Sequence, residues 1–180
     1  MVTYEELRDL KEKIEQKHAT SEHAREADVL ILTSNGEGYY KRVHDALEET
    51  LKRWKPDVTF HHAKNACDAF LTRKGVSIFI TDYFVVPDFS IRGPEPIGAL
   101  VAKLYKESEN PIIGIASPFF NQSPTALEEA YIRYCTRELG SPASISSKVK
   151  NDFGFLSYGV DERGIRALKE YIQIELVKRQ

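Results

Sequence analysis

A carboxylate follows the most strongly strand-like segment of the chain. Residues 76–81 are almost all apolar or β-branched, and Asp82 comes directly after them. Apolar residues on both faces are typical of a strand in the centre of a parallel sheet. In open α/β sheets, ligands bind outside the carboxyl ends of the strands. Asp82 is therefore the first candidate for a functional residue, although a carboxylate here can equally end a strand by accepting backbone hydrogen bonds.

A second candidate is the small polar turn that follows the first predicted strand. It contains Ser34, Asn35 and Glu37, with a glycine on each side of Glu37. A turn of this kind before a helix N-terminus can cradle the phosphate of a flavin or nucleotide. However, its two glycines fall short of a dinucleotide fingerprint, and Glu37 would repel a phosphate.

Strands and helices alternate along the chain. The predicted strands span residues 29–32, 58–62, 76–81, 111–117 and 153–157. The predicted helices span residues 3–26, 39–54, 66–73, 97–105, 124–139 and 161–178. Strands separated by helices pair in parallel through right-handed crossovers. We therefore expect an α/β fold, a flavodoxin-like three-layer sandwich whose five-stranded parallel sheet has the order 2-1-3-4-5, with an extra N-terminal helix.

The chain is expected to form a main domain over residues 28–180, preceded by a helical extension over residues 1–27. Thr3 and Glu6 fit a capping box at the start of this extension. Its apolar stripe consists of Leu7, Leu10 and Ile14. Because this stripe is too narrow for a core helix, we expect the extension to pack on the surface or on a partner.

The predicted topology brings the carboxyl ends of all the strands to one edge of the sheet. The residues found there would be 33–35, His61 or His62, Asp82, Ser117, and Ser157 with Tyr158. The first and third strands are neighbours in the expected order. Asp82 should therefore lie beside the 33–38 turn, with Ser117 on its other side.

Composition sets limits on the class of protein. The 180 residues are 42 % apolar and 29 % charged, which is ordinary for one soluble domain. The net charge of −2 argues against a broad nucleic-acid-binding surface. Cys67 and Cys135 form no CxxC pair, and no segment has the length and apolarity of a membrane span or the character of a signal peptide. We therefore expect a cytoplasmic protein with free thiols.

Residues 29–176 resemble the receiver domain of two-component response regulators. The strongest similarity covers residues 76–117, where a hydrophobic strand ends in Asp82 and a proline-bearing loop leads to an amphipathic helix. A second apolar strand then ends in Ser117, at the place of the family's terminal Ser or Thr. The resemblance implies that Asp82 accepts a phosphoryl group from a partner histidine kinase, and that the Ser117 hydroxyl turns toward that group.

The chain departs from the receiver pattern at the metal site. Receivers hold Mg²⁺ with an acidic pair just after the first strand, where this chain has residues 33–35, Thr-Ser-Asn. Mg²⁺ is a hard cation that prefers carboxylates, so neutral oxygens would bind it more weakly. Glu37, which lies further along the loop, is the weak alternative ligand beside Asp82.

A second departure concerns the conserved lysine of the family. Receivers have a lysine at the end of the fifth strand, and Tyr158 aligns there in this chain. Lys148 and Lys150 precede the predicted strand, so they would lie at the opposite edge of the sheet. A site without the acidic pair and without this lysine lacks much of the charge neutralisation on which phosphoryl transfer depends.

We therefore expect an atypical receiver, or pseudo-receiver, that acts by protein–protein contacts with a kinase or a downstream regulator. It is expected to have no resident cofactor and no enzymatic turnover. The alternatives are a receiver that is phosphorylated on Asp82 with Mg²⁺, a flavodoxin-like protein that binds FMN or a nucleotide, and an unrelated hydrolase or transferase.

Two surfaces are candidates for partner docking. The first combines residues 1–27 with the loop over residues 84–96, where Tyr83, Phe89 and Ile91 would be apolar anchors and Arg92 a polar one. The second is the face that often forms dimers in receivers, and a homodimer through it would use residues 131–139 and 158–176.

The histidines show no metal-binding signature. His61 and His62 are adjacent and would point to opposite faces of a strand. His44 and Glu48 are four residues apart on a predicted helix, a spacing that is typical of a solvated pair. The sequence therefore predicts no zinc site.

Overall fold

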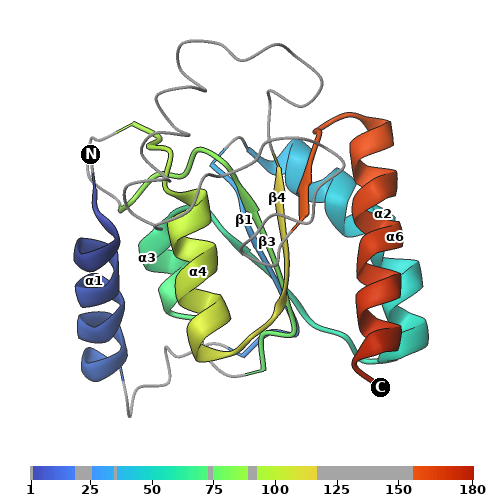
Figure 1. The fold of residues 1–180 in the computed structure, drawn as a ribbon, viewed down its shortest axis with the longest axis horizontal. Helices are drawn as coiled ribbons and strands as arrows, with labels where there is room; N and C mark the ends of the chain where they lie inside the picture. The colour runs from blue at the N-terminus through green and yellow to red at the C-terminus, as the bar shows by residue number, and fades with distance from the viewer. Residues whose placement is uncertain (1, 19–25, 35, 73–74, 89–92, 117–155) are drawn as a thin grey trace.

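The computed structural model describes residues 2–18, 26–34, 36–72, 75–88, 93–116 and 156–180. In these residues the strands form one parallel sheet with helices on both faces (Figure 1). The strands are β1 (Val29–Leu32), β2 (Phe60–Ala63), β3 (Ile78–Asp82), β4 (Ile112–Ala116) and β5 (Leu156–Tyr158), joined in the order β2-β1-β3-β4-β5. The prediction of an α/β fold with a helix-flanked parallel sheet is confirmed, and the arrangement is compatible with a flavodoxin-like fold.

Two layers of helices enclose the sheet (Figure 1). The helices are α1 (Tyr4–Lys17), α2 (Glu37–Trp54), α3 (Ala66–Phe70), α4 (Gly98–Ser108) and α6 (Glu162–Lys178). The α2 and α6 helices cover one face, and α3 and α4 cover the other, with α1 packed on α3 and α4. Side chains of β1 alternate between the two apolar cores, as the two-residue period of a strand requires.

Several element boundaries differ from the predicted ones. The second strand occupies Phe60–Ala63 instead of 58–62, because its pairing with β1 starts with Val29 opposite Phe60. The third strand includes Asp82, which pairs with Ala116 of β4. The functional candidate therefore belongs to the sheet itself and does not start the following loop.

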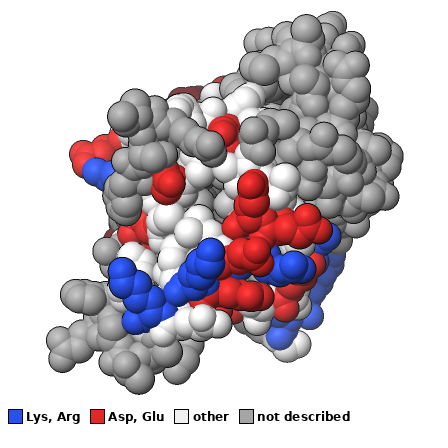
Figure 2. Space-filling model, turned by 90° about the vertical axis from the view of Figure 1, so that its left-hand side faces the viewer, with Lys and Arg blue, Asp and Glu red and all other residues white. Residues whose placement is uncertain are grey.

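The N-terminal helix α1 is more closely joined to the core than its sequence predicts. Its capping box is present, since the Thr3 hydroxyl accepts from the Glu6 amide at 3.2 Å and the Glu6 carboxylate accepts from the Thr3 amide at 2.8 Å. Leu7 is fully buried in the apolar cluster between α1 and the helices α3 and α4, whereas the other residues of α1 stay partly or fully exposed, so the helix packs on the outside of this layer. The helix ends at Lys17, well before residue 26. On the face that bears α1, acidic and basic side chains are interleaved (Figure 2).

Some predictions concern residues outside the described ranges. They include the helix over 124–139, residues 153–155 of the fifth strand, Asn35, Ser117, and the loop anchors Phe89, Ile91 and Arg92. Residues 131–139 of the predicted dimer face also lie there. None of the helices that the structure describes has the length and apolar character needed to cross a membrane.

The carboxylate of Asp28 joins three elements at the amino edge of the sheet. Its Oδ1 accepts from the Lys55 ammonium at 2.7 Å, just after α2. Its Oδ2 accepts from the Thr59 amide at 2.8 Å and from the Thr59 hydroxyl at 3.0 Å, just before β2. Burial alone would raise the pKa of Asp28, but the hydrogen bonds from Lys55 and Thr59 outweigh it and hold the pKa below its ordinary value.

Replacing Asp28 with Asn should make the stability less dependent on pH in the acidic range. Because the pKa of Asp28 is lower in the folded state, its ionised form stabilises the fold above the unfolded pKa of about 3.9, and this contribution is lost as the pH falls through the folded pKa. Urea unfolding from neutral pH down to about pH 3 should therefore show wild type and Asp28→Asn converging. A constant gap between them would contradict the role given to the Asp28 charge, and Glu49→Gln, at an exposed position on α2, is the control.

The first residue of α4 lies directly against the end of β3. A Cβ atom on Gly98 would overlap the main-chain carbonyl oxygen of Asp82, whereas a Cβ on Gly38 in the first turn of α2 would meet nothing within 4 Å. The α4 helix can approach the candidate site this closely because residue 98 has no side chain.

Gly98→Ala should lower the free energy of unfolding by about 1–3 kcal/mol, because the backbone of β3 must shift to make room. Gly38→Ala is the matched control in a first helical turn, and it should be neutral or stabilise by up to about 1 kcal/mol through helix propensity. Chemical denaturation of both variants measures the difference. Equal effects would show that the close approach of α4 to Asp82 carries no packing constraint.

Candidate functional site

Asp82 is the last residue of β3 and lies between β1 and β4 at the carboxyl edge of the sheet. Its side chain is buried, since the residue is only 2 % exposed. The main-chain N–H of Ser34, just after β1, donates to Oδ2 of Asp82 at 3.1 Å. The predicted position of Asp82 beside the 33–38 turn is therefore confirmed, whereas the functional role of Asp82 stays a prediction.

Ser34 connects three loops at this edge. While its amide contacts Asp82, its hydroxyl donates to the carbonyl of Lys64 at 3.2 Å and accepts from the amide of Val86 at 3.0 Å. The loops after β1, β2 and β3 are thus held together through one side chain and its own amide. Thr33, the residue before Ser34, is buried and continues the ladder by donating its amide to Ala63 at 3.0 Å.

Two buried tyrosines lie near the carboxylate. The hydroxyls of Tyr39 in α2 and Tyr158 in β5 are hydrogen-bonded to each other, and Tyr158 is fully buried. Burial raises the pKa of both phenols far above the usual range, and the negative charge of Asp82 raises them further. Both hydroxyls therefore stay neutral, and Tyr158 is a residue of the interior that a ligand could contact only through a rearrangement.

The ring of Tyr158 fits because β4 has a glycine beneath it. A Cβ on Gly114 would lie 3.3 Å from Cε1 of Tyr158 and 2.6 Å from Cδ1 of Leu168. The missing side chain of Gly114 is thus part of what directs the Tyr158 hydroxyl toward Tyr39. In the sequence, Tyr158 was interpreted as a substitute for a lysine, and its hydrogen bond with Tyr39 was not predicted. Predicting that bond would have required knowing that α2 and β5 are in contact.

Glu37 lies on the surface at the start of α2. Its side chain is 83 % exposed, and its carboxylate is 3.9 Å from the ammonium of Lys64. The preceding Gly36 has a φ of +95°, a conformation that favours glycine. Glu37 and Asp82 do not belong to the one group of three potential metal ligands that the described residues bring together. Their proposed partnership around a metal ion therefore gains no support from side-chain geometry.

Lys64 is a cation at this edge that sequence reasoning did not single out. It follows β2 directly, and its side chain is 67 % exposed. The signal in the sequence was its position two residues after the predicted carboxyl end of the second strand. Lys148 and Lys150, the lysines that were considered, lie outside the described residues.

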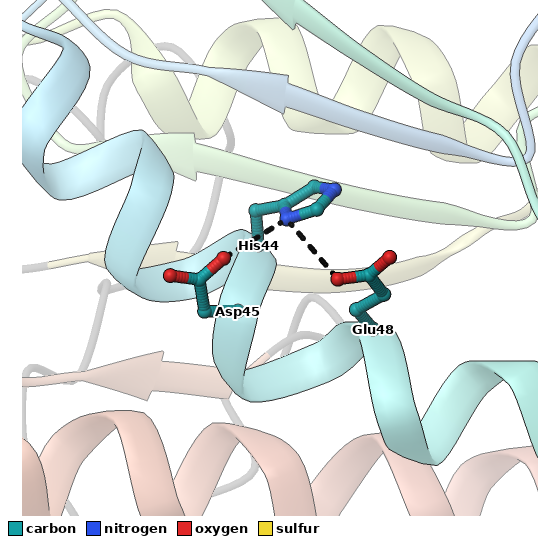
Figure 3. Close-up of side chains that lie close together, drawn as sticks. All are labelled: His44, Asp45 and Glu48. Carbon is teal, nitrogen blue, oxygen red and sulfur yellow. Dashed lines mark hydrogen bonds and ion pairs between the residues drawn. The ribbon is translucent and has the colours of Figure 1, made fainter.

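The group of three potential metal ligands consists of His44, Asp45 and Glu48 on α2 (Figure 3). Nδ1 of His44 lies 3.3 Å from Oδ1 of Asp45 and 3.9 Å from Oε2 of Glu48. Glu48 also pairs with Lys52 at 2.9 Å, one helical turn further on. This arrangement is what ionic residues at helical spacing produce on a solvated face, and it lies away from the carboxyl edge.

Two further histidines, His61 and His62, belong to the edge strand β2. His62 stacks on the ring of Tyr40 with the centroids 4.2 Å apart, and burial lowers its pKa. His61 has its Nε2 3.6 Å from a carboxylate oxygen of Asp68. The two rings have different partners, as expected of adjacent residues in a strand. Tyr83, predicted as a docking anchor, is instead buried in the core, which corrects that prediction.

Comparison with known proteins identifies no relative. No protein-family model, no curated protein and no solved structure matches this chain.

A double-mutant cycle should reveal the bond between Tyr39 and Tyr158. Each single Tyr→Phe variant should lose about 1–2 kcal/mol of unfolding free energy, because it removes a hydrogen bond and leaves the other buried hydroxyl without it. The double variant should lose less than the sum of the two, since neither hydroxyl then remains. Strictly additive losses in chemical denaturation would contradict the pairing, and Tyr40→Phe is the control at a partly exposed ring.

Proposed function

We propose that this protein is a signalling or regulatory domain that resembles an atypical receiver and acts through protein–protein contacts. In this proposal the fold is a flavodoxin-like three-layer sandwich with a five-stranded sheet, extended by an N-terminal helix. The observation that carries the proposal is the environment of Asp82, a buried carboxylate that accepts a hydrogen bond from the Ser34 amide beside two neutral phenols.

This environment is unsuited to standard phosphorylation. A phosphoacceptor carboxylate needs an open approach for the phosphoryl donor, and metal or cationic groups must neutralise the equatorial oxygens. Asp82 is buried, and the positions that receivers use for the acidic pair and the lysine have Thr33, Ser34 and the buried Tyr158. Hydroxyls and amides solvate a carboxylate, but they hold Mg²⁺ less well than carboxylates do.

The same contacts favour a structural task for Asp82. Through Ser34, the loops after β1, β2 and β3 are fixed relative to one another at one edge of the sheet. A surface whose loops are already ordered loses less conformational entropy when a partner binds. This preorganisation supports a recognition surface for a protein, of the kinase or downstream-regulator class that the resemblance implies.

The proposal also covers the setting in which the domain works. A cytoplasmic location is supported by two cysteines without CxxC spacing, and the net charge of −2 supports a protein partner over a nucleic acid. Magnesium would enter only through the phosphorylation alternative, and FMN only through the flavodoxin alternative. The exposed Glu37 in the first turn of α2 weighs against the FMN alternative, since it would repel a phosphate there.

Intact-mass spectrometry of the full chain, after incubation with acetyl phosphate and Mg²⁺, tests the proposal. We expect no gain of a phosphoryl group, because Asp82 is buried and the positions that receivers use for the acidic pair and the lysine have Thr33, Ser34 and Tyr158 in this chain. A phosphorylatable receiver domain in the same reaction serves as the positive control.

A phosphoryl gain that disappears in Asp82→Asn would overturn the proposal and make Asp82 a working phosphoacceptor. The absorbance spectrum of the same preparation tests the other alternative. Visible absorbance that copurifies with the protein would favour a flavin-binding function, whereas its absence together with no phosphoryl gain agrees with a domain that acts by contact.

A further inference from the structure

A hollow lies between α2 and α6, the two helices that cover one face of the sheet (Figure 1). Its volume is about 430 Å³, which is within the range of pockets that bind small molecules. We call this hollow the α2–α6 groove. The described residues that line it are Arg42, Asp45 and Ala46 of α2 and Glu162, Ile165, Arg166 and Lys169 of α6.

Two cations on the α6 side of the groove are neighbours. Arg166 and Lys169 are three residues apart, a spacing that places them on the same side of the helix, where their charges repel each other. Within the described part of the chain, no carboxylate forms an ion pair with either side chain. Asp45, on the α2 side, instead lies 3.9 Å from Lys41 and 3.3 Å from His44 of its own helix. The described residues therefore leave two positive charges on α6 without ion-pair partners.

Arg42 brings a third cation to the groove from α2. Its guanidinium donates to the carbonyl of Val160 at 3.3 Å and lies 5.7 Å from the centre of the Tyr39 ring. These contacts use only part of the guanidinium, and its remaining N–H groups can donate to a ligand. A side chain that is already positioned loses less conformational entropy when a ligand binds. The same contact places the groove next to Tyr39 and thus close to the phenol pair at the carboxyl edge.

The unpaired cations match a phosphate monoester in charge and in geometry. Such a group carries about two negative charges at neutral pH, as many as Arg166 and Lys169 carry positive ones. A guanidinium also binds phosphate oxygens through two parallel hydrogen bonds, and an ammonium adds a compact charge. A single carboxylate would neutralise only one of the two cations.

The other residues of the lining indicate what the phosphate is attached to. The carboxylates of Asp45 and Glu162 can accept hydrogen bonds from hydroxyl groups, but they would repel a second anionic group. Ala46 and Ile165 offer apolar contacts to a carbon skeleton. None of the described residues in this lining has an aromatic ring on which a nucleobase could stack. A hydroxylated ester therefore fits the groove better than a nucleotide does.

We propose that the α2–α6 groove binds a small sugar phosphate. Arg166 and Lys169 hold the phosphate group, and Arg42 donates to it or to an adjacent oxygen. Asp45 and Glu162 accept hydrogen bonds from the sugar hydroxyls. The proposal goes beyond the proposed function, which requires protein contacts at the carboxyl edge and no small molecule.

Isothermal titration calorimetry of the full chain with ribose 5-phosphate tests the proposal. We expect saturable binding at low ionic strength, where the cations are least screened. Ribose without a phosphate should show no binding. Inorganic phosphate should bind about tenfold more weakly than ribose 5-phosphate, because it lacks the hydroxyl groups that meet the two carboxylates.

Substitutions on α6 assign the binding to the groove. Arg166→Gln and Lys169→Gln should each weaken the binding of ribose 5-phosphate about tenfold, since each removes a charge-assisted hydrogen bond to the phosphate. Arg163→Gln is the matched control, because residue 163 is exposed on the same helix and does not line the groove. This variant loses the same charge and should bind like wild type.

The absence of binding by ribose 5-phosphate at millimolar concentration would overturn the proposal. Equal affinity for ribose 5-phosphate and inorganic phosphate would also overturn it, because the sugar would then make no contact. A third contradiction would be an equal loss in Arg163→Gln and Arg166→Gln, which indicates general electrostatic attraction. Circular dichroism verifies that each variant is folded. The titration does not depend on Asp82, so this proposal and the proposed function can fail independently.

Discussion

The buried carboxylate at the end of β3 is the constraint around which the carboxyl edge is organised. An ionised group removed from water must be compensated by hydrogen bonds or charges, or the fold loses stability. At Asp82 part of this compensation comes from a main-chain amide, that of Ser34. The amide can reach Asp82 because β1 and β3 are adjacent parallel strands that end together. The loop after β1 therefore has a conformation set by its neighbour in the sheet as much as by its own residues.

The buried carboxylates at the two edges of the sheet are compensated by different kinds of group. At the amino edge, Asp28 meets a lysine and a threonine that follow or precede other elements. At the carboxyl edge, Asp82 accepts a hydrogen bond from the Ser34 amide, and the neutral phenols of Tyr39 and Tyr158 lie nearby. A full positive charge thus balances the carboxylate that joins elements of the scaffold. Asp82 lies at the carboxyl edge, where α/β folds of this kind place their functional residues. Among the described residues, the groups beside it include a neutral amide and two neutral phenols.

Local signals in the sequence were sufficient for the class of fold and the position of Asp82. Each of these signals is contained in a short segment of consecutive residues, so it can be recognised without knowing the rest of the chain. They are the apolar runs of β1, β3 and β4 and the helical spacing of apolar residues in α2 and α6. The start of β2 was missed because its limits depend on pairing with β1, and the burial of Leu7 because it depends on α3 and α4. The partnership of Tyr39 and Tyr158 joins residues 119 positions apart, and no local pattern encodes it.

Because Tyr158 of β5 supplies the hydrogen-bond partner of Tyr39, the carboxyl edge of the sheet can be completed only late in synthesis. A chain emerges from the ribosome from its amino end, and domains form as their residues become available. Ser34, Tyr39 and Asp82 are all synthesised long before Tyr158, which completes the arrangement from β5. Until that strand docks, the Tyr39 phenol lacks its hydrogen-bond partner in the interior. A nascent or shortened chain that ends before β5 would thus expose an unfinished edge, and quality-control factors could distinguish it from the completed domain.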